Sequence, residues 1–216
     1  MSLMASQKNE SSFPPIESGS YHAVCYGVID VGTHETEYKG QKKNTHQVVL
    51  LFEIPSERIQ IEKDGKKVDL PRGVSKTYTL SLSEKAKLYE HLMQWRGIPF
   101  TKEQLDGFDL FSICGANCLL QMLQDTKDNK TYTYISGIMK LMKGMSKLNP
   151  ENPKVTYSIM ENGFNIPETL PDSIKKKIEE SQEVKAMRNA GNNPDLAAVQ
   201  EEYGMNEKVT DDEVPF

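Results

Sequence analysis

Runs of apolar residues with the period of a β-strand dominate the first two thirds of the chain. Five such runs stand out, at residues 21–31, 46–54, 75–82, 116–124 and 131–139. In the second run, Val48 and Leu50 fall on one face while Val49 and Leu51 fall on the other. The third run alternates most strictly, with small hydroxyl residues on one face and larger apolar residues on the other. Because successive side chains of a strand point to opposite faces, the pattern predicts five strands.

Glycine, proline and polar residues mark the breaks between these strands. Gly27 lies inside the first run and predicts a bend or bulge in a curved strand. Residues 32–44 are polar and predict a loop, and Pro55 is expected to end the second strand. Asp64-Gly65 is a favoured hairpin turn, so we predict a hairpin inserted between the second and third strands.

Helical signals are concentrated after the third strand and near the C-terminus. Ser83 is the predicted N-cap of a helix that ends at Gly97. A second, short helix is predicted from Thr101 or Lys102. Two further amphipathic helices are predicted at 174–187 and 194–203.

Five strands with one helix between the third and fourth, and no regular alternation of strand and helix, indicate a small antiparallel barrel. This is the element order of the five-stranded Greek-key OB-fold, which binds oligonucleotides on one sheet face and its adjoining loops. We therefore predict a mainly β chain with an OB-fold, a β-hairpin insertion and a partly helical or disordered C-terminal tail. The expected parts are a flexible lead-in, the barrel, a linker or helical extension, and an acidic tip, at 1–18, 19–145, 146–208 and 209–216.

Charge is spread unevenly along the 216 residues. Residues 172–216 contain 6 Lys or Arg and 11 Asp or Glu and therefore carry the whole net charge of −5. Residues 1–171 have no net charge. A neutral body lacks the overall basic footprint of most nucleic-acid-binding proteins, and any such site must come from local clustering. No apolar run reaches the ~20 residues of a membrane span, and no signal peptide is recognised at the N-terminus, so we expect a cytoplasmic protein without a membrane partner.

Three cysteines, Cys25, Cys114 and Cys118, predict reduced and mostly buried thiols. No second cysteine pair or histidine pair stands at ligand spacing, so no metal site is expected.

Local basic clusters do occur in the predicted loops. Single strands of nucleic acid are held by bases stacking on aromatic rings and by Lys or Arg tracking the phosphates. Each of the three predicted loops is basic and lies near a tyrosine. The candidate DNA-binding residues are Tyr38, Lys39, Lys42, Lys43, Lys66, Lys67, Arg72, Lys76, Lys127, Lys130, Tyr132 and Tyr134. The alternative interpretation is that these are ordinary surface lysines and core tyrosines.

The C-terminal residues combine acidic side chains with a rigid apolar end. Carboxylates steer an encounter with a basic surface, and a terminal ring with its carboxylate fits a pocket rimmed by Arg or Lys. We therefore expect a partner-binding tip made of Asp211, Asp212, Glu213, Val214, Pro215 and Phe216.

Signs of catalysis are lacking in the sequence. It has no Gly-rich phosphate loop, nucleophile elbow or paired-histidine metal motif, and its four histidines are scattered. We expect no catalytic residues and no cofactor, and so no enzyme.

Several motifs resemble a known family. They lie at residues 19–25, 30–33, 49–55, 79–82, 95–100 and 107–110, and the most specific is Trp95-Arg96-Gly97-Ile98-Pro99-Phe100. Over about residues 19–140 the chain resembles phage-encoded single-stranded-DNA-binding proteins, and its tip is similar to the C-terminal tip of bacterial and phage single-stranded-DNA-binding proteins. The resemblance implies an OB-fold that coats single strands during phage or prophage DNA replication or recombination. It also implies that the tip recruits host or phage replication and recombination proteins.

Two other functions remain as alternatives. An OB-type adaptor in a phage replication complex would bind protein and not DNA, and a nuclease would need clustered acidic metal ligands. The long insertions and neutral body leave the binding-site size and a possible homo-oligomer open.

Overall fold

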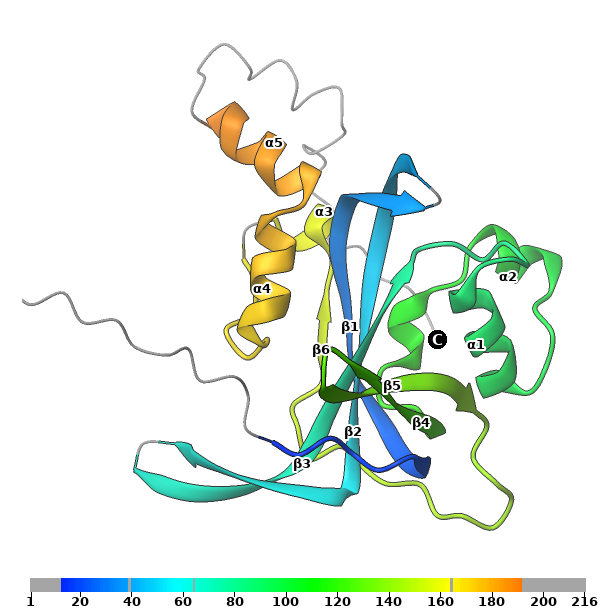
Figure 1. Ribbon diagram of the computed structural model, residues 1–216. Helices are drawn as coiled ribbons and strands as arrows, with labels where there is room; N and C mark the ends of the chain where they lie inside the picture. Colours follow the sequence, from blue (N-terminus) through cyan, green and yellow to red (C-terminus); the bar gives the residue numbers. More distant parts are fainter. Residues whose placement is uncertain (1–12, 39, 64, 164, 192–216) are drawn as a thin grey trace, which may run out of the picture.

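Strand β1, Gly19–Tyr38, lies at the centre of the sheet in the computed structural model (Figure 1). The structure describes residues 13–38, 40–63, 65–163 and 165–191. In chain order the other elements are β2 Gln41–Lys63, β3 Lys66–Thr79, α1 Lys87–Arg96, α2 Lys102–Asp106, the 3-10 helix η1 Leu110–Ile113, β4 Asn117–Lys127, β5 Lys130–Met139, β6 Val155–Tyr157, α3 Ile159–Asn162, α4 Asp172–Glu179 and α5 Gln182–Gly191.

The sheet is antiparallel and curled into a half-barrel, with strand order β3-β2-β1-β4-β5. β1 pairs with β2 along most of its length and with β4 through its first residues, from Gly19↔Met122 to Val24↔Asn117. The short β6 adds a parallel pairing to β1. This arrangement confirms the predicted mainly β class and its five principal strands.

Two bulges bend β1 where it passes from one partner to the other. The register shifts between Cys25 and Gly27 and again between Asp30 and Gly32. A Cβ atom on Gly27 would lie 2.8 Å from Cδ1 of Leu51, so a larger residue would require the Leu51 side chain to move. The bend predicted at Gly27 is thereby confirmed, because a bulge both breaks the ladder and increases the local twist.

The concave side of the sheet encloses the main core. Val48, Leu50 and Phe52 of β2 point into it, and α1 closes it with Leu88 and Trp95. The Trp95 indole is buried and donates through Nε1 to the Asn117 carbonyl at 2.8 Å.

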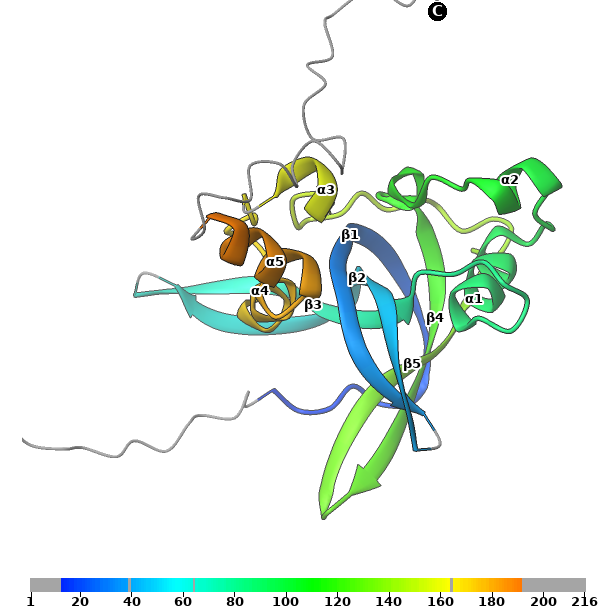
Figure 2. The same ribbon diagram turned by 90° about the horizontal axis from the view of Figure 1, so that it is seen from above.

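A second core lies on the opposite side of β1 and β2. Val49 and Leu51 are buried there against Tyr157, Ile174 and Ile178, which belong to β6 and α4. Figures 1 and 2 show α4 and α5 on one side of the sheet, with α1 and α2 on the other. Residues 155–163 and 165–191, which lie within the predicted linker or helical extension at 146–208, therefore form an outer layer packed on the sheet.

The structure corrects several predicted boundaries. Residues 32–44 are not a loop: β1 and β2 continue their pairing there, from Thr33↔His46 to Tyr38↔Gln41. β2 does not end at Pro55, because it passes through an irregularity between Ile54 and Arg58 and pairs with β3 as far as Lys63↔Lys66. The predicted hairpin insertion is thus the extended end of β2 and β3.

The helix boundaries also differ from the predictions at two places. Ser83 is not the N-cap of α1, which starts at Lys87 with Ala86 in the N-cap position. The helix predicted at 174–187 is divided into α4 and α5 around the buried Ser181, whose Oγ accepts from the Val184 amide and so caps α5. α2 follows a capping box between Thr101 and Gln104, as predicted for its start. The helix predicted at 194–203 lies outside the described residues.

The thiols of Cys25 and Cys118 are buried and that of Cys114 is partly buried, and all three are free. Within the described ranges no group of three or more His, Cys, Asp or Glu side chains is arranged to hold a metal ion. No helix in those ranges has the length and apolar character needed to cross a membrane.

The second core predicts a measurable stability contribution from the outer layer. Ile178 is fully buried, so Ile178→Ala should lower the free energy of unfolding by about 2–5 kcal/mol. Lys176→Ala on the same helix is the matched control and should change it by less than about 0.5 kcal/mol, because its contact with Glu180 is exposed. Urea denaturation measures both, and equal values for the two variants would show that the layer does not contribute to folding.

Candidate nucleic-acid interface

A groove of about 390 Å³ runs along the seam where the edge strands β3 and β5 approach each other. Its walls are residues 72–75 of β3 and 131–135 of β5, with Met122 at its base. Residues Phe13, Pro15 and Ile16 line it from the N-terminal side. Among the predicted site residues, Arg72, Tyr132 and Tyr134 therefore lie along one groove.

Lys76 closes the seam beside this groove. Its Nζ donates to the carbonyl of Ile135, and its charge lies 5.9 Å from the Tyr78 ring centroid. Burial lowers the pKa of Lys76, and the nearby positive charge of Lys87 lowers it further. Lys76 thus links the two edge strands, and its ammonium is largely committed to that contact.

Arg72 lies at the more open part of the seam. Burial lowers its pKa, against the nearby Glu57 carboxylate, which raises it. Its guanidinium carbon lies 5.1 Å from the centroid of the Phe13 ring, and its Nη2 donates to the Pro14 carbonyl at 3.4 Å. Arg72 is therefore a cationic surface on which an aromatic ring already rests.

The β4–β5 hairpin presents aromatic and basic residues on one face. The register places Tyr134 opposite Leu123 and Lys130 opposite Lys127, and alternation puts Tyr132 on the same face as these residues. Tyr132 and Tyr134 are 43% and 41% exposed, so their rings are accessible to solvent. Such a row of rings and lysines is what stacking and phosphate contacts require.

An aspartate on this face holds one of the rings. The hydroxyl of Tyr132 donates to Oδ2 of Asp125 at 2.9 Å, and this hydrogen bond raises the pKa of Tyr132. The contact fixes the ring of Tyr132 across the hairpin and leaves one carboxylate on an otherwise basic and aromatic face.

The remaining predicted residues are divided between two other hairpins. Lys42 and Lys43 are exposed near the end of the β1–β2 hairpin, where Lys42 forms a 2.8 Å ion pair with Glu35. Lys66 and Lys67 are exposed at the end of the β2–β3 hairpin. Lys39 and the side chain of Tyr38 lie outside the described residues, and so do the six residues of the predicted tip.

The three hairpins do not converge on one surface. In Figure 2 the β1–β2 and β4–β5 hairpins run toward the lower edge, whereas the β2–β3 hairpin runs to the left, as it also does in Figure 1. The fold thus separates Lys66 and Lys67 from the β4–β5 face, whereas Arg72, Tyr132 and Tyr134 line one groove.

The N-terminal segment is a part of this region that the sequence analysis did not identify. The carbonyl of Ile16 accepts from Gln124 Nε2 at 3.0 Å and from Thr133 Oγ1 at 2.9 Å, and the Ile16 side chain is buried in the main core. Ser18 Oγ accepts from the Gln124 amide at 3.0 Å. Residues 13–18 of the expected flexible lead-in are therefore held against β3, β4 and β5, and residues 1–12 lie outside the described residues. The available signal was the pair of apolar residues, Phe13 and Ile16, flanking two prolines in a polar segment.

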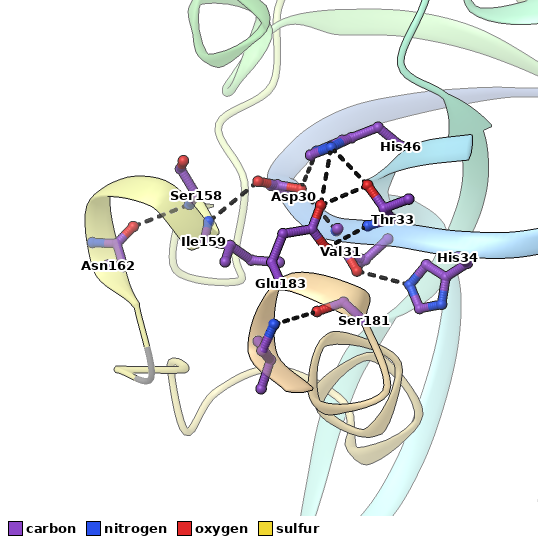
Figure 3. A network of polar contacts seen from close by, with 12 residues as sticks. Asp30, Val31, Thr33, His34, His46, Ser158, Ile159, Asn162, Ser181 and Glu183 are labelled. Carbon is purple, nitrogen blue, oxygen red and sulfur yellow. Dashed lines mark hydrogen bonds and ion pairs between the residues drawn. The ribbon is translucent and has the colours of Figure 1, made fainter. Parts of the chain in front are cut away.

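A second polar cluster joins the outer layer to the sheet (Figure 3). Glu183 of α5 accepts from the Thr33 amide at 2.7 Å and from the Thr33 hydroxyl at 2.6 Å. His46 of β2 lies between two carboxylates, with Nε2 2.7 Å from Asp30 and Nδ1 3.6 Å from Glu183. Asp30 also accepts from the Ile159 amide at 3.2 Å, so the cluster connects β1, β2, α3 and α5.

The ionisation of this cluster follows from its contacts. The hydrogen bond to Asp30 raises the pKa of His46. Burial by itself raises the pKa of Asp30, but hydrogen bonds from His46 and the Gly32 amide outweigh it and lower the pKa. The same balance holds for Glu183, whose pKa is lowered by its bonds from Thr33. The two carboxylates therefore stabilise the protonated form of His46 relative to its neutral form.

The order Asp30, His46, Thr33 has the residue types of a nucleophilic triad. Here, however, the Thr33 hydroxyl donates its proton to Glu183 at 2.6 Å and lies 3.4 Å from His46 Nδ1. The geometry supports a latch between layers, because the hydroxyl donates its proton to the Glu183 carboxylate and so does not donate it to the imidazole.

Comparison with family models and with curated proteins finds no match to this chain.

The cluster predicts a pH-dependent contribution to stability. Because the pKa of His46 is raised in the folded protein, its contribution to stability is complete below its unfolded pKa of 6.5 and is lost as the pH rises through its folded pKa. Because the pKa values of Asp30 and Glu183 are lowered, their contributions to stability are complete above their unfolded pKa values of 3.8 and 4.5. Those contributions are lost as the pH falls through the folded pKa values. The difference in unfolding free energy between the wild type and His46→Gln should therefore be largest between about pH 5 and 6 and decline as the pH rises through the folded pKa of His46.

Chemical denaturation across this pH range measures the difference. Ile178→Ala is the matched control, because its loss is apolar and should not vary with pH. A His46→Gln difference that is constant across the range would contradict the proposed charge state of the latch.

Proposed function

We propose that the chain is a single-stranded-DNA-binding protein without enzymatic activity, built on an OB-fold. The observation that carries the proposal is the face of the β4–β5 hairpin, where two exposed tyrosines are aligned with Lys127 and Lys130. Bases stack on aromatic rings with little sequence preference, and lysines neutralise the phosphates between them.

The strand arrangement supports the OB-fold assignment. β1 is shared between β2 and β4, the edge strands β3 and β5 meet at the Lys76 contact, and α1 lies between β3 and β4 in the sequence. In the OB-fold the loop joining strands 4 and 5 contributes to oligonucleotide binding. The β4–β5 hairpin occupies the corresponding place in the chain.

The outer layer restricts where a strand of DNA binds. Val49 and Leu51, on the outward side of β2, are buried beneath this layer and are closed to a ligand. The proposed path therefore follows the β4–β5 hairpin and the β3–β5 groove. The C-terminal residues Asp211 to Phe216 are proposed to recruit host or phage replication and recombination proteins, a role that rests on their composition.

The binding activity is tested by fluorescence anisotropy of a labelled dT strand of about 30 nucleotides, long enough for one or more OB-fold sites. We expect binding to the single strand that weakens with salt, and much weaker binding to a duplex of equal length. Absence of binding at low salt would overturn the proposal and favour the protein-adaptor alternative.

Separate contributions are expected from the rings and the lysines of the hairpin face. Tyr134→Ala should weaken binding about 5-fold or more, the effect of losing one stacked base. Leu123→Ala, which removes an apolar neighbour on the same face, is the matched control and should have little effect.

Changing Lys127 and Lys130 together to Ala should reduce the slope of log K against log salt by about 1.4, since each single-strand phosphate contact contributes about 0.7.

Lys66→Ala, titrated with the dT strand at the same salt concentrations, is the control for the Lys127 and Lys130 variant. Lys66 lies at the end of the β2–β3 hairpin, away from the proposed path, so its loss should leave the slope unchanged. A Lys66 effect as large as the Lys127 and Lys130 effect would place the DNA elsewhere.

A further inference from the structure

The segment from Phe13 to Ile16 has two differently held parts. Ile16 is 6% exposed, is part of the main core, and receives two hydrogen bonds on its carbonyl. Phe13 is 37% exposed, and the described contacts of its ring are with Arg72 and the groove. The segment is thus anchored at Ile16 and held more weakly at Phe13.

The weakly held ring occupies a position that suits a different aromatic group. The Arg72 guanidinium carries a delocalised charge on a planar surface, and such a plane attracts any π-system placed over it. A nucleobase is flat and aromatic like a phenyl ring, and Arg planes commonly support bases in nucleic-acid complexes. Phe13 lies 5.1 Å from the guanidinium, within the range of a cation–π contact.

The lining of the groove includes groups that can bind a nucleotide. Hydroxyl-bearing residues, Ser75 of β3 and Thr131 of β5, line it together with the backbone of both strands. The groove volume of about 390 Å³ is empty space beside the Phe13 ring, which forms part of the lining. This space has room for a base and its sugar.

We propose that Arg72 is a nucleobase-stacking subsite, and that Phe13 occupies it in the free protein and is displaced by a base of the bound single strand. This inference rests on the proposed function, because it assigns one position along the same nucleic-acid path. Ile16 stays in the core during the exchange, so the barrel remains closed while residues 13–15 move aside.

The exchange makes Phe13 a competitor of the ligand. Removing the ring with Phe13→Ala should therefore strengthen binding of a dT strand about two- to five-fold, the factor that corresponds to one partly exposed cation–π contact. Arg72→Ala should weaken binding and should also abolish the gain from Phe13→Ala in the double variant. Leu105→Ala, which removes a similarly exposed apolar side chain on α2, and Arg188→Ala, which removes a guanidinium on α5, are the matched controls.

An abasic strand separates base stacking from phosphate binding. It carries the same phosphates as dT but no bases, so the gain from Phe13→Ala should appear with dT and not with the abasic strand. A Phe13→Trp variant gives a second readout, because its indole emission should shift on addition of dT while the buried Trp95 stays unchanged. Thermal unfolding of every variant confirms that the fold is retained.

The possible failures are distinguishable. If the wild type binds dT but Phe13→Ala leaves the affinity unchanged or lowers it, the subsite is wrong and the proposed function stands. If the gain is equal on dT and on the abasic strand, Phe13 obstructs phosphates and the nucleobase assignment is overturned. If neither the wild type nor any variant binds dT at low salt, the proposed function and this inference fall together.

Discussion

The pairing of β1 with β2 is the interaction on which the rest of the structure depends. Both strands are buried on two faces at their centre, so each contributes to the main core through one set of side chains and to the second core through the other. Such a pair cannot shift its register by one residue without exchanging the two sets of side chains. The bulges at Gly27 and Gly32 then direct the same strand toward β4 on one side and toward the outer layer on the other. At Gly32 a Cβ atom would lie 2.6 Å from Ser181 and Glu183, so the outer layer approaches the backbone itself.

This central pair also determines where a ligand can bind. The outer layer covers the outward face of β2, and the polar latch around His46 holds that cover in place. The accessible surfaces along the barrel are consequently the edge strands and the projecting hairpins. The proposed DNA path over the β4–β5 hairpin and the β3–β5 groove follows from this coverage as much as from the presence of tyrosines and lysines.

The sequence predicted which segments form strands better than it predicted where those strands end. The alternation of Val48, Val49, Leu50 and Leu51 gave the faces of β2 correctly, but apolar residues on both faces also indicate a strand buried on both sides, which is how the structure uses them. Residues 32–44 were predicted to be a loop because their side chains are polar. A hairpin that projects into solvent has no apolar face, so its strands lack the alternating pattern by which strands are recognised. Pro55 did not end β2, because it lies in the irregular stretch between Ile54 and Arg58, where no ladder hydrogen bond from its nitrogen is needed.

The candidate site was predictable only in part. Tyr132 and Tyr134 share a face because they are two residues apart in a strand, and this follows from the sequence. The contact of Lys76 with Ile135, and that of Arg72 with Phe13, join residues 59 positions apart and depend on how the sheet curls. No local pattern contains that information.

The most direct test of the DNA path is photo-crosslinking of the full chain to a dT strand carrying 5-iododeoxyuridine, with the linked peptides identified by mass spectrometry. The proposed path predicts crosslinks at Tyr132 or Tyr134 and at Phe13 or Arg72, which line the groove. Crosslinks confined to the helices α4 and α5, or to the end of the β2–β3 hairpin, would contradict it.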